Sequence, residues 1–237
     1  MFLAIYFTGD FMKKGLCLLT VAFFSFSSLI CYADMSKDDV INHFNDISSD
    51  RVIEFSDISK YPWAQEPITS LAKLGIVNGV GNGLFSPDNT VSRFEFIKMI
   101  TGVCGLVNKN SASPYIDLDK THWAYTYVAS AFEMELLDIY SDKVFNGAAP
   151  ITREEIAYIS AKAMVKSGVI EDNQNQIPLF NDTDKMSDFS PSAIAVLASL
   201  NVINGRSDGS FCPKDFATRA EAAKIVYNVL NIAENNF

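Results

Sequence analysis

Apolar residues recur at helical spacing in three pairs of segments, and every pair is organised in the same way. In the first segment of each pair, apolar side chains stand five, eight and eleven positions after a bulky aromatic residue, which is Trp63, Trp123 or Phe189. In the second segment they stand four, seven and eleven positions after a serine or threonine. Because both sets of offsets place the apolar side chains on one helix face, the pattern predicts three pairs of amphipathic helices.

The second helix of each pair is expected to begin with a capping box, in which a hydroxyl residue precedes a glutamate by three positions. The three copies are Ser92-Arg93-Phe94-Glu95, Thr152-Arg153-Glu154-Glu155 and Thr218-Arg219-Ala220-Glu221. In this motif the hydroxyl accepts a hydrogen bond from a free backbone N–H, and the glutamate reaches back to another.

An arginine follows the hydroxyl residue in every copy, at positions 93, 153 and 219. A cation at this place meets the positive end of the helix dipole, where anions are favoured. Three arginines in register therefore indicate that each guanidinium has a partner. The sequence leaves two partners open: a carboxylate of the protein itself, which would form an internal salt bridge, or an anionic ligand.

The helix pairs belong to a longer internal repeat, which we place at residues 53–108, 113–168 and 178–232. Each unit opens with an aromatic-x-Asp motif, whose aspartates are Asp57, Asp117 and Asp182. In the first and third units a turn separates the helices and contains Asn78-Gly79 or Asn204-Gly205. Glycine permits positive φ and lets other atoms approach the backbone closely.

Together, the aromatic-x-Asp motif, the Trp-Ala pairs at 63–64 and 123–124, the Asn-Gly turn with its later Phe-x-Pro, and the Thr-Arg-Ala-Glu box resemble the S-layer homology (SLH) domain. The resemblance covers about residues 53 to 232. It implies an all-α fold of three helix-loop-helix repeats in a pseudo-threefold unit, with a central helix bundle and grooves between the repeats. It also implies a secreted, non-catalytic module at the cell wall or S-layer that binds secondary cell wall polysaccharide through a pyruvylated sugar.

The resemblance implies a ligand site built from residues that recur in the repeats. A pyruvate ketal carries a carboxylate, to which arginine offers a planar, bidentate fork, and a helix N-terminus adds N–H groups. A tryptophan offers an apolar face to the sugar ring. The expected ligand-binding residues are Arg93, Arg153, Arg219, Trp63, Trp123, Asp57, Asp117, Asp182, Gly79 and Gly205. No metal ion or cofactor is expected.

The second unit departs from the family pattern at its turn. Ile139 replaces the first glycine, Lys143 replaces the second, and Gly147 replaces the proline. The first unit also has Phe94 where the family prefers alanine, and the third has Phe189 in place of tryptophan. We therefore expect unequal grooves, with the second turn least suited to a close approach by a ligand.

The N-terminal segment predicts export. Two lysines precede an apolar run from Leu16 to Ile30, and cleavage is expected after Ala33. Residues 1–33 are therefore expected to be a signal peptide, with a retained membrane anchor and a lipoprotein as rival interpretations. Residues 34–52 are expected to form a lead-in helix.

The charge of the chain excludes one class of partner and keeps an alternative function open. With 19 basic and 28 acidic residues, the chain has a formal net charge of −9, which argues against nucleic acid. An anionic polymer would have to be bound by local cationic sites. The negative charge and the altered second turn favour the alternative, an envelope protein-interaction scaffold with the same fold and a degenerate sugar site.

The sequence contains no pattern typical of an enzyme. The two histidines, His43 and His122, lie in different segments without metal-ligand spacing, and no nucleophile elbow or phosphate loop is present. The three aspartates suit glycosidase chemistry less well than a structural role, capping the turn that enters each unit. A signal-anchored hydrolase therefore ranks third.

For Cys104 and Cys212, two separate thiols are favoured over a disulfide because the equivalent residues in the other repeats are not cysteines.

Overall fold

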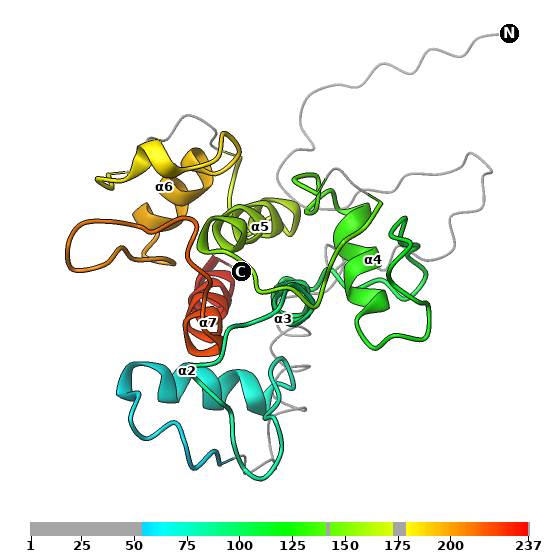
Figure 1. The fold of residues 1–237 in the computed structure, drawn as a ribbon, viewed down its shortest axis with the longest axis horizontal. Helices are drawn as coiled ribbons and strands as arrows, with labels where there is room; N and C mark the ends of the chain where they lie inside the picture. Colours follow the sequence, from blue (N-terminus) through cyan, green and yellow to red (C-terminus); the bar gives the residue numbers. More distant parts are fainter. Residues whose placement is uncertain (1–53, 141–142, 173–178, 237) are drawn as a thin grey trace, which may run out of the picture. The chain divides into compact units, whose positions relative to one another are not determined.

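The computed structural model describes residues 54–140, 143–172 and 179–236 (Figure 1). Within these ranges the chain is helical and has no strand; the helices are α2 (Pro62–Lys73), α3 (Arg93–Val103), α4 (Tyr125–Glu133), α5 (Arg153–Lys166), α6 (Pro191–Ser199) and α7 (Arg219–Asn236). A short 3₁₀ turn, Thr183–Lys185, precedes α6. No helix in these ranges has the length and hydropathy needed to cross a membrane. The predicted signal peptide (1–33) and lead-in helix (34–52) lie outside the described residues.

Helices α3, α5 and α7 pack against one another at the centre, and α2, α4 and α6 lie around them (Figure 1). Each outer helix packs on the central helix of the preceding repeat: α4 on α3, α6 on α5 and α2 on α7. The first helix of the first repeat therefore packs on the last helix of the third. This interleaving closes the three repeats into a ring, and it confirms the predicted all-α fold with a central bundle.

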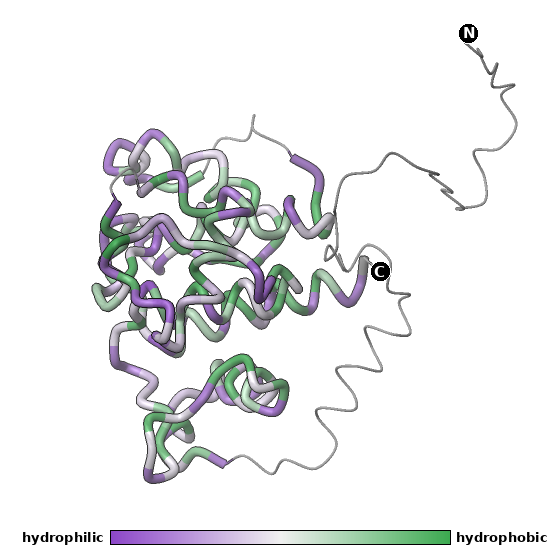
Figure 2. The backbone as a smooth tube through the Cα atoms, turned by 90° about the vertical axis from the view of Figure 1, so that its right-hand side faces the viewer, coloured by the Kyte–Doolittle hydropathy of each residue, from purple (hydrophilic) through white to green (hydrophobic). Residues whose placement is uncertain are grey.

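The predicted apolar stripes form the core, and hydrophobic and hydrophilic positions alternate along the helices (Figure 2). All nine stripe positions on the central helices are buried: Phe96, Met99, Val103, Ile156, Ile159, Ala163, Ala222, Ile225 and Val229. On the outer helices the first two positions of each stripe are also buried. The third position is only partly covered; its residues, Leu74, Met134 and Leu200, are the C-caps that directly follow α2, α4 and α6.

All three predicted capping boxes form. In each box the hydroxyl accepts a hydrogen bond from the backbone N–H of the glutamate, and the glutamate carboxylate accepts one from the backbone N–H of the hydroxyl residue. The pairs are Ser92–Glu95, Thr152–Glu155 and Thr218–Glu221. The central helices therefore begin where the sequence predicted.

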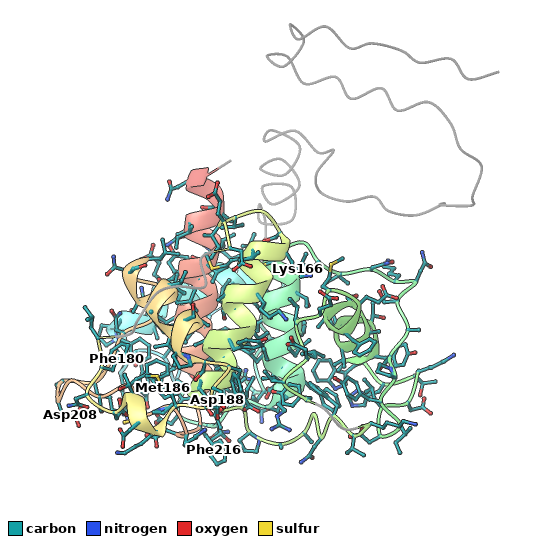
Figure 3. All side chains as sticks on the ribbon, turned by 90° about the horizontal axis from the view of Figure 1, so that it is seen from above. Lys166, Phe180, Met186, Asp188, Asp208 and Phe216 are labelled. Carbon is teal, nitrogen blue, oxygen red and sulfur yellow. The ribbon has the colours of Figure 1, made fainter. Side chains whose placement is uncertain are left out.

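The residues just before the capping boxes hydrogen bond to one another in a ring. The N–H of Val91 donates to the carbonyl of Ala217 (3.0 Å), that of Ala217 to Ile151 (3.2 Å), and that of Ile151 back to Val91 (3.1 Å). The ring brings the three helix N-termini together at one end of the bundle. Phe216 lies near this end in Figure 3, and Lys166, the last residue of α5, lies toward the opposite end.

Candidate ligand groove between the repeats

Each arginine of the capping boxes forms an ion pair with the capping-box glutamate of the next repeat. The pairs are Arg93–Glu155 (Nη2 to Oε1, 2.8 Å), Arg153–Glu221 (Nη1 to Oε1, 3.4 Å) and Arg219–Glu95. Because Arg219 belongs to the third repeat and Glu95 to the first, the three pairs also close a ring. Of the two partners that the sequence left open, the internal carboxylate is present in all three repeats.

The same arginines hold the turn of the next repeat. Arg219 donates from Nε to the carbonyl of Phe85 (2.9 Å) and from Nη2 to the carbonyl of Asn78 (2.8 Å), and its guanidinium lies 4.6 Å from the centre of the Phe85 ring. Arg153 donates to the two equivalent carbonyls of the third turn, at 2.8 and 3.1 Å. These contacts leave Arg219 only 5% and Arg153 only 8% exposed.

Backbone N–H groups at the starts of the central helices are also occupied. The N–H groups of Arg219 and Ala220 donate to the carbonyls of Asn89 and Pro87, at 2.8 and 3.1 Å, and the two other helix starts make equivalent bonds. The capping hydroxyl accepts from the third N–H of each helix. An anion in a groove would therefore meet side-chain cations rather than these N–H groups.

The three aspartates of the aromatic-x-Asp motifs each accept two backbone N–H groups from the turn before the second helix. Asp57 accepts from Phe85 and Ser86, at 2.9 and 2.7 Å. Ser86 has a φ of +59°, which L-residues rarely adopt, so the two hydrogen bonds stabilise a strained turn. The aspartates thus hold the turn that precedes the second helix of each repeat. The sequence had indicated the turn at the start of each repeat instead. The equivalents are Asp117 with Phe145 and Asn146, and Asp182 with Phe211 and Cys212.

Gly79 and Gly205 lie directly against aromatic rings of their own repeats. A Cβ added at Gly79 would lie 2.6 Å from the ring of Phe55 and from the carbonyl oxygen of Leu84. A Cβ at Gly205 would lie 2.5 Å from the ring of Phe180. The aromatic residue of the aromatic-x-Asp motif therefore packs onto the glycine. This internal packing explains the two glycines without any ligand.

A pocket of about 210 Å³ opens beside the first turn. It is lined by residues 76–80 of the turn, Glu95, Lys98 and Met99 of α3, Trp123 of the second repeat and Arg219 of the third. All three repeats therefore contribute to one site. Of the residues expected from the sequence, the pocket brings together Gly79, Trp123 and Arg219.

Lys98 was not among the residues expected from the sequence. It is partly buried in the pocket, and its pKa is lowered by this burial and by the nearby charge of Arg219, while Glu95 acts in the opposite direction. Lys98 and Arg219 thus form a cationic pair that Glu95 partly neutralises. A signal was present in the sequence, because Lys224 stands at the same position in α7, whereas the second repeat has Tyr158.

Trp123 provides the exposed aromatic surface of this pocket. Its side chain is 53% exposed and contacts the ring of Phe94, with 6.1 Å between ring centres. Trp63, the counterpart of Trp123 in the first repeat, is 50% exposed. It stands at the start of α2, which packs on α7, so the threefold arrangement places it beside the third turn. Large exposed aromatic side chains of this kind are characteristic of binding surfaces.

Two departures from the repeat pattern in the first and second units compensate each other. A Cβ at Gly147 would lie 2.0 Å from the ring of Phe94. Phe94 stands where Glu154 and Ala220 stand in the other capping boxes, and only its large ring fills the space that a proline at 147 would need. The Phe94 ring and a side chain at position 147 therefore exclude each other.

In the part of the chain that the structure describes, no group of three or more His, Cys, Asp or Glu residues is placed to hold a metal ion. Cys104 and Cys212 are separate thiols. Burial raises the pKa of Cys104 to about 12, so this thiol is unreactive at neutral pH.

The fold and the pocket define a class of protein: a closed ring of three interleaved helix-loop-helix repeats with a pocket lined by residues of all three. Residues 54–97, 114–157 and 179–223 each match the S-layer homology domain, and the chain belongs to this family. The family resemblance read from the sequence is therefore confirmed.

Relatives of this chain include both enzymes and surface proteins. The chain is 31% identical over 183 residues to an exoglucanase of Acetivibrio thermocellus, covering 77% of this chain and 17% of that protein. It is 29% identical over 154 residues to a cellulosome-anchoring protein of the same species (63% of this chain, 34% of that protein). It is 26% identical over 158 residues to a surface-layer 125 kDa protein of Lysinibacillus sphaericus (67% and 13%). The shared region is the repeats, so the catalytic activity of the first relative does not transfer with it.

Proposed function

We propose that this chain is a non-catalytic anchor that binds an acidic carbohydrate of the bacterial cell wall. The observation that carries the proposal is the pocket in which Lys98, Arg219 and Trp123 meet from three different repeats. The names of two relatives, a cellulosome-anchoring protein and a surface-layer protein, support a location of this chain at the cell surface and wall.

The chemistry of the pocket suits a sugar that carries a carboxylate, such as the pyruvate ketal of a secondary cell wall polysaccharide. Arg219 and Lys98 both line the pocket, and Arg219 uses only three of its five N–H groups within the protein. Trp123 offers an apolar face to the sugar ring, and Glu95 can accept from its hydroxyls. The pocket is smaller than the roughly 300–1,000 Å³ of sites for drug-sized ligands, which suits one terminal sugar.

The third turn repeats this set of residues. Asn204 and Gly205 match the asparagine and glycine of the first turn, and Lys224 matches Lys98. Arg153 matches Arg219, and Trp63 is the counterpart of Trp123. We assign the other expected residues, Arg93 and the three aspartates, to holding the turns that shape the grooves.

Paired lysine variants test this proposal. We expect Lys98→Ala and Lys224→Ala each to weaken binding at its own groove by about ten- to a hundredfold, the value of a charged hydrogen bond of about 1.5–3 kcal/mol. Calorimetry with a pyruvylated oligosaccharide, and with the same oligosaccharide after removal of its pyruvate, measures the loss. Lys109→Ala is the matched control, because Lys109 is exposed and lies beyond the end of α3, away in sequence from every residue that lines the pocket. Unchanged binding in the double variant would refute the proposal.

A protein-interaction scaffold is the second candidate, and one surface favours it. On the second repeat, Ile116 is 77% exposed and Val144 is 49% exposed, and the two segments are joined by the hydrogen bond from the N–H of Ile116 to the carbonyl of Lys143. These apolar side chains lie beside the atypical turn. If the chain binds no acidic sugar, and Ile116→Ser abolishes its retention on the envelope, the scaffold is the function.

A further inference from the structure

The second groove differs from the first in what fills it. We propose that Tyr140 occupies the space that a ligand enters in the first groove, so that only the first and third grooves take the acidic sugar. The identity of the sugar rests on the function proposed above, whereas the closure is a property of the chain alone.

The direction of the Tyr140 side chain is the first observation. Val80 and Arg206 stand at the same position of their turns and are both exposed, and Arg206 reaches outward to Asp215, with 2.8 Å between Nη2 and Oδ2. Tyr140 turns inward instead. Its ring lies 4.6 Å from the guanidinium carbon of Arg93 and packs edge-on against Phe145, with 5.2 Å between ring centres.

The second observation is that Arg93 binds its turn differently from the other two arginines. Arg153 and Arg219 use Nε for the phenylalanine carbonyl of the next turn, whereas Arg93 reaches the carbonyl of Phe145 with Nη1, at 3.2 Å. The Nε of Arg93 is buried and has no hydrogen-bond partner. Its guanidinium lies on the Tyr140 ring, whereas those of Arg153 and Arg219 lie on the phenylalanine rings of their turns.

Buried hydroxyls give the third observation. The hydroxyls of Tyr140 and Tyr115 are both buried, that of Tyr140 near the carboxylate of Glu155, and both rings contact Phe145. Packing against Phe145 therefore holds the Tyr140 ring in place. Burial and the negative charge of Glu155 raise the pKa of Tyr140, with Arg93 opposing, which keeps the phenol neutral.

The second groove also lacks the lysine and the asparagine of the first groove. Tyr158 stands where the first groove has Lys98, and its hydroxyl donates to the carboxylate of Asp138 at 3.0 Å. Asp138 itself replaces the asparagine of the other turns and pairs with Lys162 at 2.7 Å. Phe189, the counterpart of Trp123, packs on Tyr158 with 5.2 Å between ring centres. An aromatic and acidic lining thus replaces an amide and a lysine, which disfavours a carboxylate ligand.

Titration of the full chain with a monosaccharide bearing a pyruvate ketal tests this inference. We expect the wild type to bind two equivalents of the sugar, and Lys98→Ala and Lys224→Ala to bind one equivalent each. Tyr140→Phe keeps the aromatic ring and should bind two equivalents, as the wild type does. A variant with the first-groove residues in the second groove (Asp138→Asn, Ile139→Gly, Tyr140→Val and Tyr158→Lys) should bind a third equivalent. Three equivalents in the wild type, or NMR shifts of Tyr140 on binding, would overturn the inference.

A second measurement separates closure of the groove from the identity of its ligand. With no sugar present, a soluble gadolinium chelate should broaden the indole signals of Trp123 strongly and the ring signals of Tyr140 little. This pattern would support closure even if no sugar binds, in which case only the proposed function fails. Equal broadening of the two rings would show that the second groove is open and would refute the inference.

Discussion

Arg219 of the last repeat pairs with Glu95 of the first, so one ion pair joins the two ends of the repeat array. The other carboxylate oxygen of Glu95 accepts a hydrogen bond from the backbone N–H of Ser92 at 2.8 Å. A single carboxylate therefore caps α3 and fixes the closure of the ring. Glu155 and Glu221 have the same double role in the second and third repeats.

Replacing Arg219 by alanine should lower the free energy of unfolding by about 3 kcal/mol, because it leaves the partner of a largely buried pair uncompensated. Arg206→Ala is the matched control, since the Arg206–Asp215 pair is about half exposed on both sides and should contribute less than about 1 kcal/mol. Urea unfolding of both variants makes the comparison. Equal losses would mean that the ring of pairs does not stabilise the fold.

Gly147→Ala should destabilise the fold by about 1–3 kcal/mol, because the added methyl group would overlap the ring of Phe94. In a Phe94→Ala background the same change should cost much less, since the ring is gone. A double-mutant cycle by chemical unfolding measures this coupling between the two sites. If the two losses simply add, the proposed compensation between these positions is wrong.

Glu154 should make stability sensitive to acid. Its buried carboxylate accepts hydrogen bonds from Ser187 and Ser190 and pairs with Lys214. Burial acts to raise the pKa of Glu154, but the hydrogen bonds from Lys214 and Ser187 outweigh it, and the pKa is lowered. The stabilisation is therefore complete above the unfolded-state pKa of about 4.3 and is lost as the pH falls through the lower folded-state pKa.

Unfolding by urea at several pH values between 7 and 3 tests this dependence. Glu154→Gln should be less stable than the wild type at neutral pH, and the difference should shrink as the pH falls below about 4. A difference that stays constant over the whole range would show that the charge of Glu154 does not contribute.

Sugar binding should weaken at alkaline pH. Because burial and Arg219 lower the pKa of Lys98, this side chain loses its charge at a lower pH than an ordinary lysine of pKa about 10.4. In a Lys224→Ala background, which isolates the first groove, the affinity should fall as the pH rises through the pKa of Lys98. Lys98→Arg stays charged and should flatten this profile in calorimetric titrations between pH 7 and 10. The same decline in both proteins would exclude Lys98 as the titrating group.

The sequence predicts the local features of this protein well. The helix starts at Ser92, Thr152 and Thr218 follow from capping chemistry, and the core faces follow from helical periodicity. The partners of the arginines could not be derived in this way, because they depend on which repeat lies beside which. Spacing within a repeat does not reveal that α2 packs on α7 or that Arg219 reaches Glu95.

The candidate site was predicted only in part for the same reason. Trp123 and Arg219 were identified because they recur, but the pocket that unites them is formed by three repeats. Lys98 was missed because a lysine on a helix face is ordinarily solvated, and its burial arises from the neighbouring repeats. The packing of Phe55 on Gly79 was hidden as well, since the two lie far apart in the chain.

A sedimentation assay with purified cell wall sacculi tests whether the chain binds the secondary polysaccharide of the wall. The chain is mixed with sacculi that carry their secondary polysaccharide and with the same sacculi after acid has removed it. We expect the wild type to sediment only with the intact wall, and the Lys98→Ala, Lys224→Ala double variant to remain in solution with both. Equal binding to the stripped wall, or undiminished binding of the double variant, would refute binding of the polysaccharide through these two lysines.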